Sequence, residues 1–225
     1  MKKGLTELVF LLDRSGSMAG LEKDTIGGYN AMIQEQREQE GEVLVSTVLF
    51  DHETTVITDR MPMDRVKLLD EKTYRVRGST ALLDAIGGSI THIGNVHKYA
   101  RTEDVPEKTL FMITTDGMEN SSHIYTYRRV KEMVERQREK YHWEFLFLGA
   151  NMDAIQEAAR FGISGKGRAV SYECDEEGTA LNYRVMSTIV SAARRSESRE
   201  KLEEILDEAD LVSPITAHYR KSHRK

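Results

Sequence analysis

A carboxylate and two hydroxyls stand at alternate positions at the end of the apolar run in LVFLLDRSGSM. They belong to Asp13, Ser15 and Ser17. In an extended or open-loop backbone, alternate side chains point the same way, so the three oxygens can converge on one point. Carboxylate and hydroxyl oxygens are hard ligands, suited to Mg²⁺ or Mn²⁺ rather than to soft metals. Taken alone, the three residues also fit an ordinary polar turn in which Asp13 caps a helix.

Apolar runs and amphipathic stretches alternate along the chain, which is the pattern of strands alternating with helices. The predicted strands cover 6–12, 43–50, 54–58, 108–115, 143–148 and 168–172. The predicted helices cover 24–40 with Asp24 as N-cap, 81–99, 127–140, 152–160 and 178–194. Gly27 and Gly28 inside the first helix indicate close packing against a neighbour.

The fold class follows from the connections between these elements. Only Asp51, His52 and Glu53 separate the second and third strands, which is too short for a helical crossover, so this pair forms an antiparallel hairpin. The other strands alternate with helices, as in a parallel sheet. We expect an α/β fold: a Rossmann-like, doubly wound, mostly parallel sheet with one antiparallel edge strand and helices on both faces.

In such a sheet, ligands bind beyond the carboxyl ends of the strands, where the strand order reverses. With the strand order 3-2-1-4-5-6, the strands that end at Asp13 and at Asp116 are neighbours on either side of this point. Both carboxylates and the hydroxyls of Ser15 and Ser17 then face one crevice. Thr80, in the Gly-Ser-Thr turn before the helix at 81–99, supplies a third hydroxyl.

The set Asp13-x-Ser15-x-Ser17, Thr80 and Asp116 resembles the metal-ion-dependent adhesion site of von Willebrand factor type A (VWA) domains. The resemblance covers roughly residues 5–195 and includes the antiparallel hairpin. Three further segments are similar to cytoplasmic bacterial members of this family: GSTALLDAI at 78–86, TTDGMEN at 114–120 and FLGAN at 147–151.

The resemblance implies a site in which Ser15, Ser17 and Thr80 approach a divalent cation, and Asp13 and Asp116 bind it directly or through water. Mg²⁺ is the first expectation, and Mn²⁺ and Ca²⁺ are the alternatives. Neutral hydroxyls leave the ion under-neutralised, so a Glu or Asp carboxylate of a partner protein is its natural further ligand. We therefore expect a metal-dependent protein–protein interaction module.

Residues around the motif carry weaker expectations. Asp84 either orients the loop before it or forms a local contact. Arg14 is expected to point outward, either solvated or favouring an acidic partner. Glu119 and Asn120 are expected at the rim of the site, and Met18 either contacts a partner or packs in the core.

With 225 residues that are 39% hydrophobic, the chain can build one full-sized core with room for a small appendage. The charged fraction of 31% and the three prolines argue against wholesale disorder. The single Cys174 rules out an internal disulfide framework and favours a reducing compartment. The apolar run at 8–12 is too short for a signal peptide, and no run approaches the roughly 20 apolar residues of a membrane span. We expect a cytoplasmic protein without a membrane segment.

The C-terminal stretch differs in charge. We expect a VWA domain at 1–195 and a charged surface helix with a basic tail at 196–225, the helix lying within 198–211. The formal net charge is −5, and the four cations of 215–225 leave −9 on residues 1–214. The tail is either a solvated, mobile end or a contact for RNA or another acidic surface, whereas the acidic body argues against general nucleic-acid binding.

An enzyme is the other class of protein that these residues could indicate. An aspartyl phosphotransferase needs a second acid two residues after Asp13, and that position is Ser15. The histidines show no zinc spacing, the stretch 162–167 misses the Walker pattern, and Cys174 has no local signature of a nucleophile. We therefore assign no catalytic residue. The alternative to a protein-binding module is a protein that associates with RNA through its basic tail.

Overall fold

Six strands form one sheet in the computed structural model, which describes residues 1–150, 153–208 and 210–223. The strands are β1 (Lys2–Asp13), β2 (Val43–Phe50), β3 (Thr54–Pro62), β4 (Pro106–Thr115), β5 (Glu144–Ala150) and β6 (Ala169–Tyr172). Their order is β3-β2-β1-β4-β5-β6; β2 and β3 pair antiparallel and the other neighbours pair parallel. The predicted fold class and strand order are confirmed.

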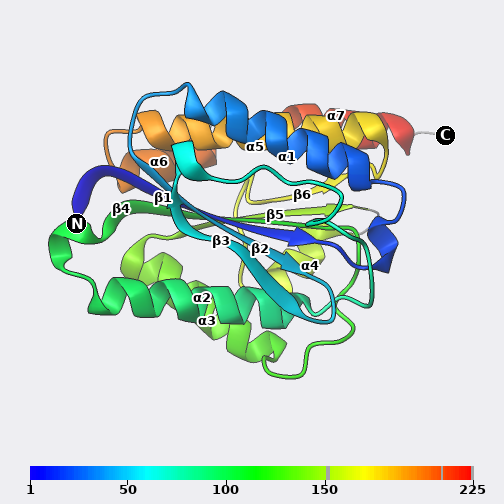
Figure 1. Ribbon diagram of the computed structural model, residues 1–225, viewed down its shortest axis with the longest axis horizontal. Coiled ribbons are helices and arrows are strands. Elements are labelled where there is room, and N and C mark those ends of the chain that lie inside the picture. The colour runs from blue at the N-terminus through cyan, green and yellow to red at the C-terminus, as the bar shows by residue number, and fades with distance from the viewer. Residues whose placement is uncertain (151–152, 209, 224–225) are drawn as a thin grey trace.

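Helices cover both faces of the sheet (Figure 1). One face carries α1 (Glu22–Arg37), α5 (Glu176–Arg195), α6 (Arg199–Glu208) and α7 (Ser213–Ser222). The other face carries α2 (Leu82–Tyr99), α3 (Tyr127–Tyr141) and α4 (Ala154–Arg160). Short 3₁₀ turns lie at Gly16–Met18, Met63–Arg65 and Thr102–Asp104.

The sequence of β1 explains why both faces are covered. Leu8, Phe10 and Leu12 belong to the core that α1 and α5 share, whereas Val9 and Leu11 belong to the core under α2 and α3. Because successive side chains of a strand point to opposite faces, an unbroken apolar run fills two cores. The end of β1 is thereby held between two packed layers.

The first helix begins two residues before the predicted position, so Asp24 is not its N-cap. The cap position is Leu21, which makes no side-chain cap bond. The carboxylate of Glu22 accepts the N–H of Gly20 at 2.7 Å and adds negative charge to the first turn, where the helix dipole favours it. Asp24 lies within the same first turn, so it adds negative charge at the helix N-terminus instead of capping it.

The expected close packing of the first helix is present at Gly28. A Cβ added there would lie 2.3 Å from Cδ2 of Tyr183 in α5, whereas one added to Gly27 would meet nothing within 4 Å. Only a residue without a side chain lets α1 and α5 approach this closely.

The C-terminal helices pack on the same core as the rest of this face. Leu202 and Leu206 of α6 and Ile215 of α7 are buried in the core that α1 and α5 share. The helix expected within 198–211 is present as α6. The expectation of a solvated, mobile end at 215–225 is wrong for residues 215–222, because they belong to α7, whose Ile215 is buried in this core. The domain boundary between 195 and 196 stays a prediction.

A few expected features lie outside the described residues. These are Asn151 in FLGAN, Met152 at the expected helix start, and Arg224 and Lys225 of the basic tail. The described part of α4 follows Asp153, whose side chain accepts the N–H of Gln156 at 3.0 Å. Among the described residues, no helix is long and apolar enough to cross a membrane.

Candidate metal centre

The carboxyl ends of β1 and β4 meet at one edge of the sheet. The two strands are neighbours, and their register pairs Leu12 with Thr114. The next residues are joined by a hydrogen bond, in which Oγ1 of Thr115 donates to Oδ2 of Asp13 at 2.5 Å. Asp116 follows directly in the chain, so both predicted carboxylates lie at this edge.

Asp13 is only 1% exposed, and both of its carboxylate oxygens are engaged. Oδ1 accepts the N–H of Ser15 at 2.6 Å, while Oδ2 accepts the hydroxyl of Thr115. Burial raises the pKa of Asp13 to about 6, and the nearby charge of Asp116 acts in the same direction. A cation at this edge would favour the ionised carboxylate over the protonated one.

The two motif serines connect the end of β1 to Asp116. The 3₁₀ turn at Gly16–Met18 follows Ser15, whose Oγ lies 3.0 Å from Oγ of Ser17. Oγ of Ser17 in turn donates to Oδ1 of Asp116 at 2.5 Å. Burial raises the pKa of Asp116 above its ordinary value. The serines and both carboxylates therefore form one connected group of oxygens.

Three hydroxyl oxygens surround one small space beside Gly117. A Cβ added to Gly117 would lie 2.7 Å from Oγ1 of Thr80, 3.1 Å from Oγ of Ser17 and 3.5 Å from Oγ of Ser15. Glycine thus leaves room for a group that contacts all three hydroxyls. Three hydroxyls beside two carboxylates form an all-oxygen donor set, which fits a hard divalent cation such as Mg²⁺ or Mn²⁺.

The structure brings together all five predicted residues, Asp13, Ser15, Ser17, Thr80 and Asp116. Their role as metal ligands stays a prediction. Their separation along the chain is large, since Ser17 and Asp116 are 99 residues apart. The sheet order makes this possible, because it places the ends of β1 and β4 side by side.

Thr80 reaches the site on a turn that residues 119–121 hold in place. Its N–H donates to Oδ1 of Asn120 at 2.9 Å, and its carbonyl accepts the N–H groups of Asn120 and Ser121 at 3.1 and 3.2 Å. Glu119 accepts the N–H of Leu83 at 2.9 Å. Glu119 and Asn120, which were expected at the rim, therefore also position the loop that carries Thr80.

Arg14 points inward, so the expectation of an outward, solvated side chain is wrong. It is 7% exposed, and its Nε donates to Oδ2 of Asp51 at 2.7 Å. Nε of Arg77 donates to the same oxygen at 2.9 Å, and the N–H of Arg77 donates to the carbonyl of Arg14 at 2.8 Å. Burying the Asp51 carboxylate requires positive partners, and Arg14 is one of them. This pairing ties the motif loop to the turn before Thr80.

Asp51, His52 and Glu53 bring three potential ligand atoms within 4.8 Å of one another, so they are a second group that could hold a metal. Two guanidinium groups already donate to the Asp51 carboxylate. A divalent cation there would be repelled by both of these positive charges. We therefore assign this group to anchoring the loops.

The structure also decides between the alternatives that the sequence leaves open for Met18 and Asp84. Met18 is 2% exposed, so it packs in the interior instead of offering a contact to a partner. The carboxylate of Asp84 accepts the N–H groups of residues 123–125 at 2.8 to 3.0 Å. Asp84 thus orients the loop after the site, and not the turn that carries Thr80.

Three side chains that contact the site were not identified from the sequence. Thr115 bonds Asp13 as described, the hydroxyl of Tyr74 donates to the carbonyl of Asp13, and Sγ of Cys174 lies 3.9 Å from Oδ2 of Asp116. Thr115 alone had a signal in the sequence, since it directly precedes Asp116. The other two come from distant segments that local patterns cannot place.

A family model described as a VWA domain containing CoxE-like protein matches residues 2–144, which is more than half of the chain. No curated protein matches the sequence. Several solved structures are similar in fold.

A mutant of the PilB minor pilin from Streptococcus sanguinis has a TM-score of 0.57 and 12% identity, over 82% of this chain and 61% of that one. A von Willebrand factor type A structure from Catenulispora acidiphila has a TM-score of 0.53 and 13% identity, over 81% and 41%. The manganese-loaded TRAP protein of Plasmodium vivax has a TM-score of 0.53 and 16% identity, over 80% and 73%. At these identities the likeness shows the fold alone, and this chain spans only part of the length of the first two.

Proposed function

Because the chain belongs to the family of VWA domain containing CoxE-like proteins, we propose that it is a metal-dependent protein-binding module and not an enzyme. Asp13, Ser15, Ser17, Thr80 and Asp116 would hold a divalent cation, with Mg²⁺ as the first choice and Mn²⁺ or Ca²⁺ as alternatives. The partner is a protein that presents a Glu or Asp carboxylate. Neither a nucleic acid nor a membrane is part of the proposal.

One observation carries the proposal: three hydroxyl oxygens enclose the space that Gly117 leaves open. Hydroxyls are neutral, so the only charged groups of this set are Asp13 and Asp116. A divalent cation bound there supplies an attraction for an anionic oxygen from outside. A donor set with more carboxylates would satisfy the ion internally and would leave no reason for a partner to bind.

The surrounding residues prepare the site before any ligand arrives. Thr115 and the N–H of Ser15 orient the carboxylate of Asp13, and Asn120 holds the turn that carries Thr80. Groups that are already fixed lose little conformational entropy on binding, which increases affinity. The proposal also includes a reducing, cytoplasmic compartment, which the single Cys174 supports.

Calorimetric titration of metal-stripped protein with Mg²⁺ and Mn²⁺ tests the metal site. We expect saturable one-site binding that Gly117→Ala weakens by at least about tenfold, because the added methyl group fills the space between the hydroxyls. Asp13→Asn should have a similar effect, since it removes one of the two charges. Gly88→Ala is the matched control, because a Cβ there meets nothing within 4 Å. Full binding by Gly117→Ala would mean that the ion lies elsewhere.

Water proton relaxation of the Mn²⁺-loaded protein tests the carboxylate partner. Glutarate, used as a small carboxylate probe, should lower the relaxation enhancement in a saturable way as it replaces metal-bound water. The amide analogue glutaramide is the control and should have no effect. Metal binding without any response to glutarate would leave a metal site but contradict the proposed mode of partner recognition.

A further inference from the structure

A cavity of about 700 Å³ lies between α2 and α3, away from the candidate metal centre. It is lined by Pro106 and Glu107, the first residues of β4, whereas Asp116 follows the last residue of this strand. Ten residues of strand span roughly 33 Å, so the cavity and the metal centre are at opposite edges of the sheet. Its size is within the range of small-molecule sites.

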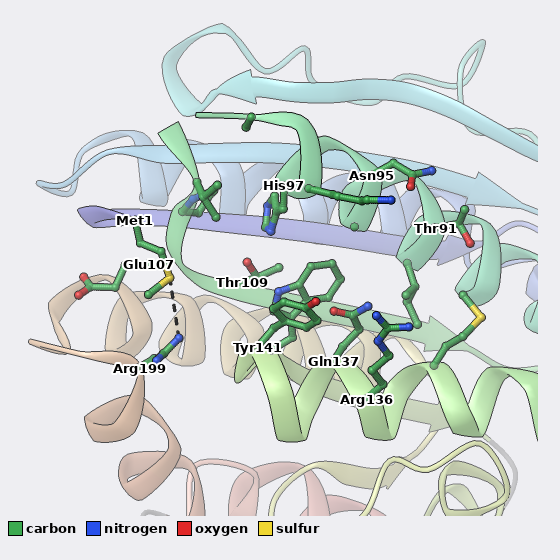
Figure 2. A pocket seen from close by; sticks show the side chains of 18 of the residues that line it. Met1, Thr91, Asn95, His97, Glu107, Thr109, Arg136, Gln137, Tyr141 and Arg199 are labelled. Atoms are coloured by element: carbon green, nitrogen blue, oxygen red, sulfur yellow. Dashed lines mark hydrogen bonds between the residues drawn. The ribbon is translucent and has the colours of Figure 1, made fainter. Parts of the chain in front are cut away.

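Side chains of the two helices face one another across this cavity, as Figure 2 shows. Thr91, Asn95 and His97 come from α2, and Arg136, Gln137 and Tyr141 come from α3. The wall therefore combines amides, a hydroxyl, a guanidinium group and aromatic rings. Such a mixture is typical of a site that holds an organic molecule in one orientation.

The charged side chains of the lining are four cations and two acids: Lys98, Arg129, Arg136, Arg199, Glu107 and Glu132. Both acids are engaged, Glu107 by a backbone N–H at 2.9 Å and Glu132 by arginines of its own helix. Arg129 and Arg199 pair with acids. Lys98 and Arg136 form no ion pair with a carboxylate among the described residues: Nζ of Lys98 lies 5.0 Å from the centroid of the Tyr99 ring, and Arg136 hydrogen-bonds Tyr141. Their positive charge is available to an anion.

Aromatic rings form the inner part of the wall. Trp143 is 4% exposed and stacks on Phe111, with the ring centroids 5.4 Å apart. His97 packs edge-on against Trp143 at 5.3 Å, and its Nε2 is engaged by Glu7. Tyr141, which also lines the cavity, is 42% exposed. Of these rings, Tyr141 has the accessible apolar surface for a planar molecule, and Trp143 contributes to the buried wall.

We propose that this cavity binds a small aromatic anion: a planar ring that bears a carboxylate, sulfonate or phosphate group. The anionic group pairs with Arg136 and Lys98, and the ring lies against Tyr141, in the cavity that Trp143 also lines. A neutral apolar molecule would gain no attraction from these two exposed cations, and a cation would be repelled by them. This site does not depend on the proposed metal centre.

Trp143 is the only tryptophan of the chain, so its fluorescence reports directly from the cavity. The full chain is titrated with anilinonaphthalene sulfonate, an aromatic anion, and separately with phenylnaphthylamine, its neutral counterpart. We expect one saturable site for the sulfonate, with quenching of Trp143 and energy transfer to the dye. The neutral dye should bind at least about tenfold more weakly, because it cannot pair with the cations.

Two arginine variants on the same helix separate the cavity from general charge effects. Arg136→Met should weaken binding of the sulfonate by at least about tenfold. Arg128→Met removes the same charge, but its side chain is 90% exposed and lies outside the lining, so binding should be unchanged. Thermal unfolding and Mg²⁺ titration of both variants show that the fold and the metal centre are intact. If the dye does not bind while Mg²⁺ still does, the cavity proposal fails and the proposed metal-dependent function is unaffected.

Equal affinity for the two dyes, an equal loss in both variants, or an unchanged Trp143 signal would overturn the proposal. Competition identifies the kind of anion. Displacement of the dye by benzoate supports a small aromatic anion. Displacement by a hexaglutamate peptide but not by benzoate would assign the cavity to an acidic protein segment and would also overturn it.

Discussion

The hydroxyl of Thr115 donates to the carboxylate of Asp13 at 2.5 Å and so joins the carboxyl ends of β1 and β4. The same oxygen accepts the N–H of Gly117 at 3.1 Å. One side chain therefore sets the position of a predicted ligand and of the glycine that leaves the site open. This makes Thr115 a positioning residue for the metal centre.

Replacing Thr115 with valine keeps its shape but removes this hydrogen bond. We expect Thr115→Val to weaken Mg²⁺ binding by about tenfold, because the Asp13 carboxylate loses its orientation. Thr115→Ser keeps the hydroxyl and should bind nearly as well as the natural protein. Calorimetry of the three proteins at one pH makes the comparison. Equal affinity in the valine variant would show that Asp13 is held by its other contacts.

The pH dependence of metal binding follows from the raised pKa of Asp13. Burial moves this pKa from 3.8 to about 6 in the metal-free protein. Below this pH a proton competes with the cation, so the affinity for Mg²⁺ should fall by about tenfold per pH unit and should level off above it. Titrations in two buffers of different ionisation enthalpy would detect the released proton. A flat profile between about pH 5 and 7 would contradict the involvement of Asp13.

The same pKa predicts how stability responds to metal. The folded metal-free protein binds the Asp13 proton more tightly than the unfolded chain does. This stabilising contribution is present at low pH and is lost as pH rises from about 4 through about 6. Saturating Mg²⁺ should therefore raise the unfolding temperature more at neutral pH than at about pH 5. A calcium-free, metal-stripped sample heated with and without Mg²⁺ provides the measurement.

The contact between α1 and α5 predicts opposite effects at two adjacent glycines. Gly28→Ala places a Cβ 2.3 Å from the Tyr183 ring and should lower the free energy of unfolding by about 1–3 kcal/mol. Gly27→Ala enters open space and should be neutral or stabilising by up to about 1 kcal/mol. Urea unfolding of the two variants is the test. Similar stabilities would mean that the helices can move apart at little cost.

The inward position of Arg14 predicts a loss of stability when its charge is removed. Burial raises the pKa of Asp51, but the N–H of Glu53 and the guanidinium groups of Arg77 and Arg14 outweigh burial and hold this pKa below its ordinary value. Arg14→Met should cost about 2–4 kcal/mol of unfolding free energy at neutral pH. Arg77→Met should cost clearly less than Arg14→Met, because that side chain is half exposed and its charge is screened by solvent.

Because the pKa of Asp51 is lowered in the folded protein, the pairing of Asp51 with Arg14 also predicts a pH dependence of stability. A depressed pKa in the folded state contributes stability above the ordinary value of about 4, and this contribution is lost as pH falls through the folded pKa. The difference between Arg14→Met and the natural protein should therefore shrink in acid. A variant as stable as the natural protein at neutral pH would contradict the buried pairing.

Substitution of Leu206 tests whether α6 and α7 unfold together with the rest of the chain. It is 4% exposed and belongs to the core that α1 and α5 share. Leu206→Ala should cost about 2–5 kcal/mol and preserve a single unfolding transition. Glu203→Ala, at an exposed position of the same helix, should have little effect. An unchanged midpoint in the leucine variant would support a separate unit after residue 195.

Much of the fold could be predicted because local patterns report local structure. The apolar run at 8–12 indicated that the predicted strand at 6–12 is buried on both faces, and the three-residue connection at 51–53 required a hairpin. Element bounds were less accurate, since β3 extends to Pro62 and α1 begins at Glu22. Bounds depend on turn chemistry and on packing beyond the element itself.

For the site, the sequence by itself determined which oxygens are available and which strand ends carry them. Only the tertiary structure decided that Arg14 turns inward, because its partner Asp51 is 37 residues away. The same is true of the space beside Gly117, of α7 against the core, and of the cavity between α2 and α3. Periodicity records which face of an element is apolar, whereas contacts between distant side chains exist only once the whole chain has packed.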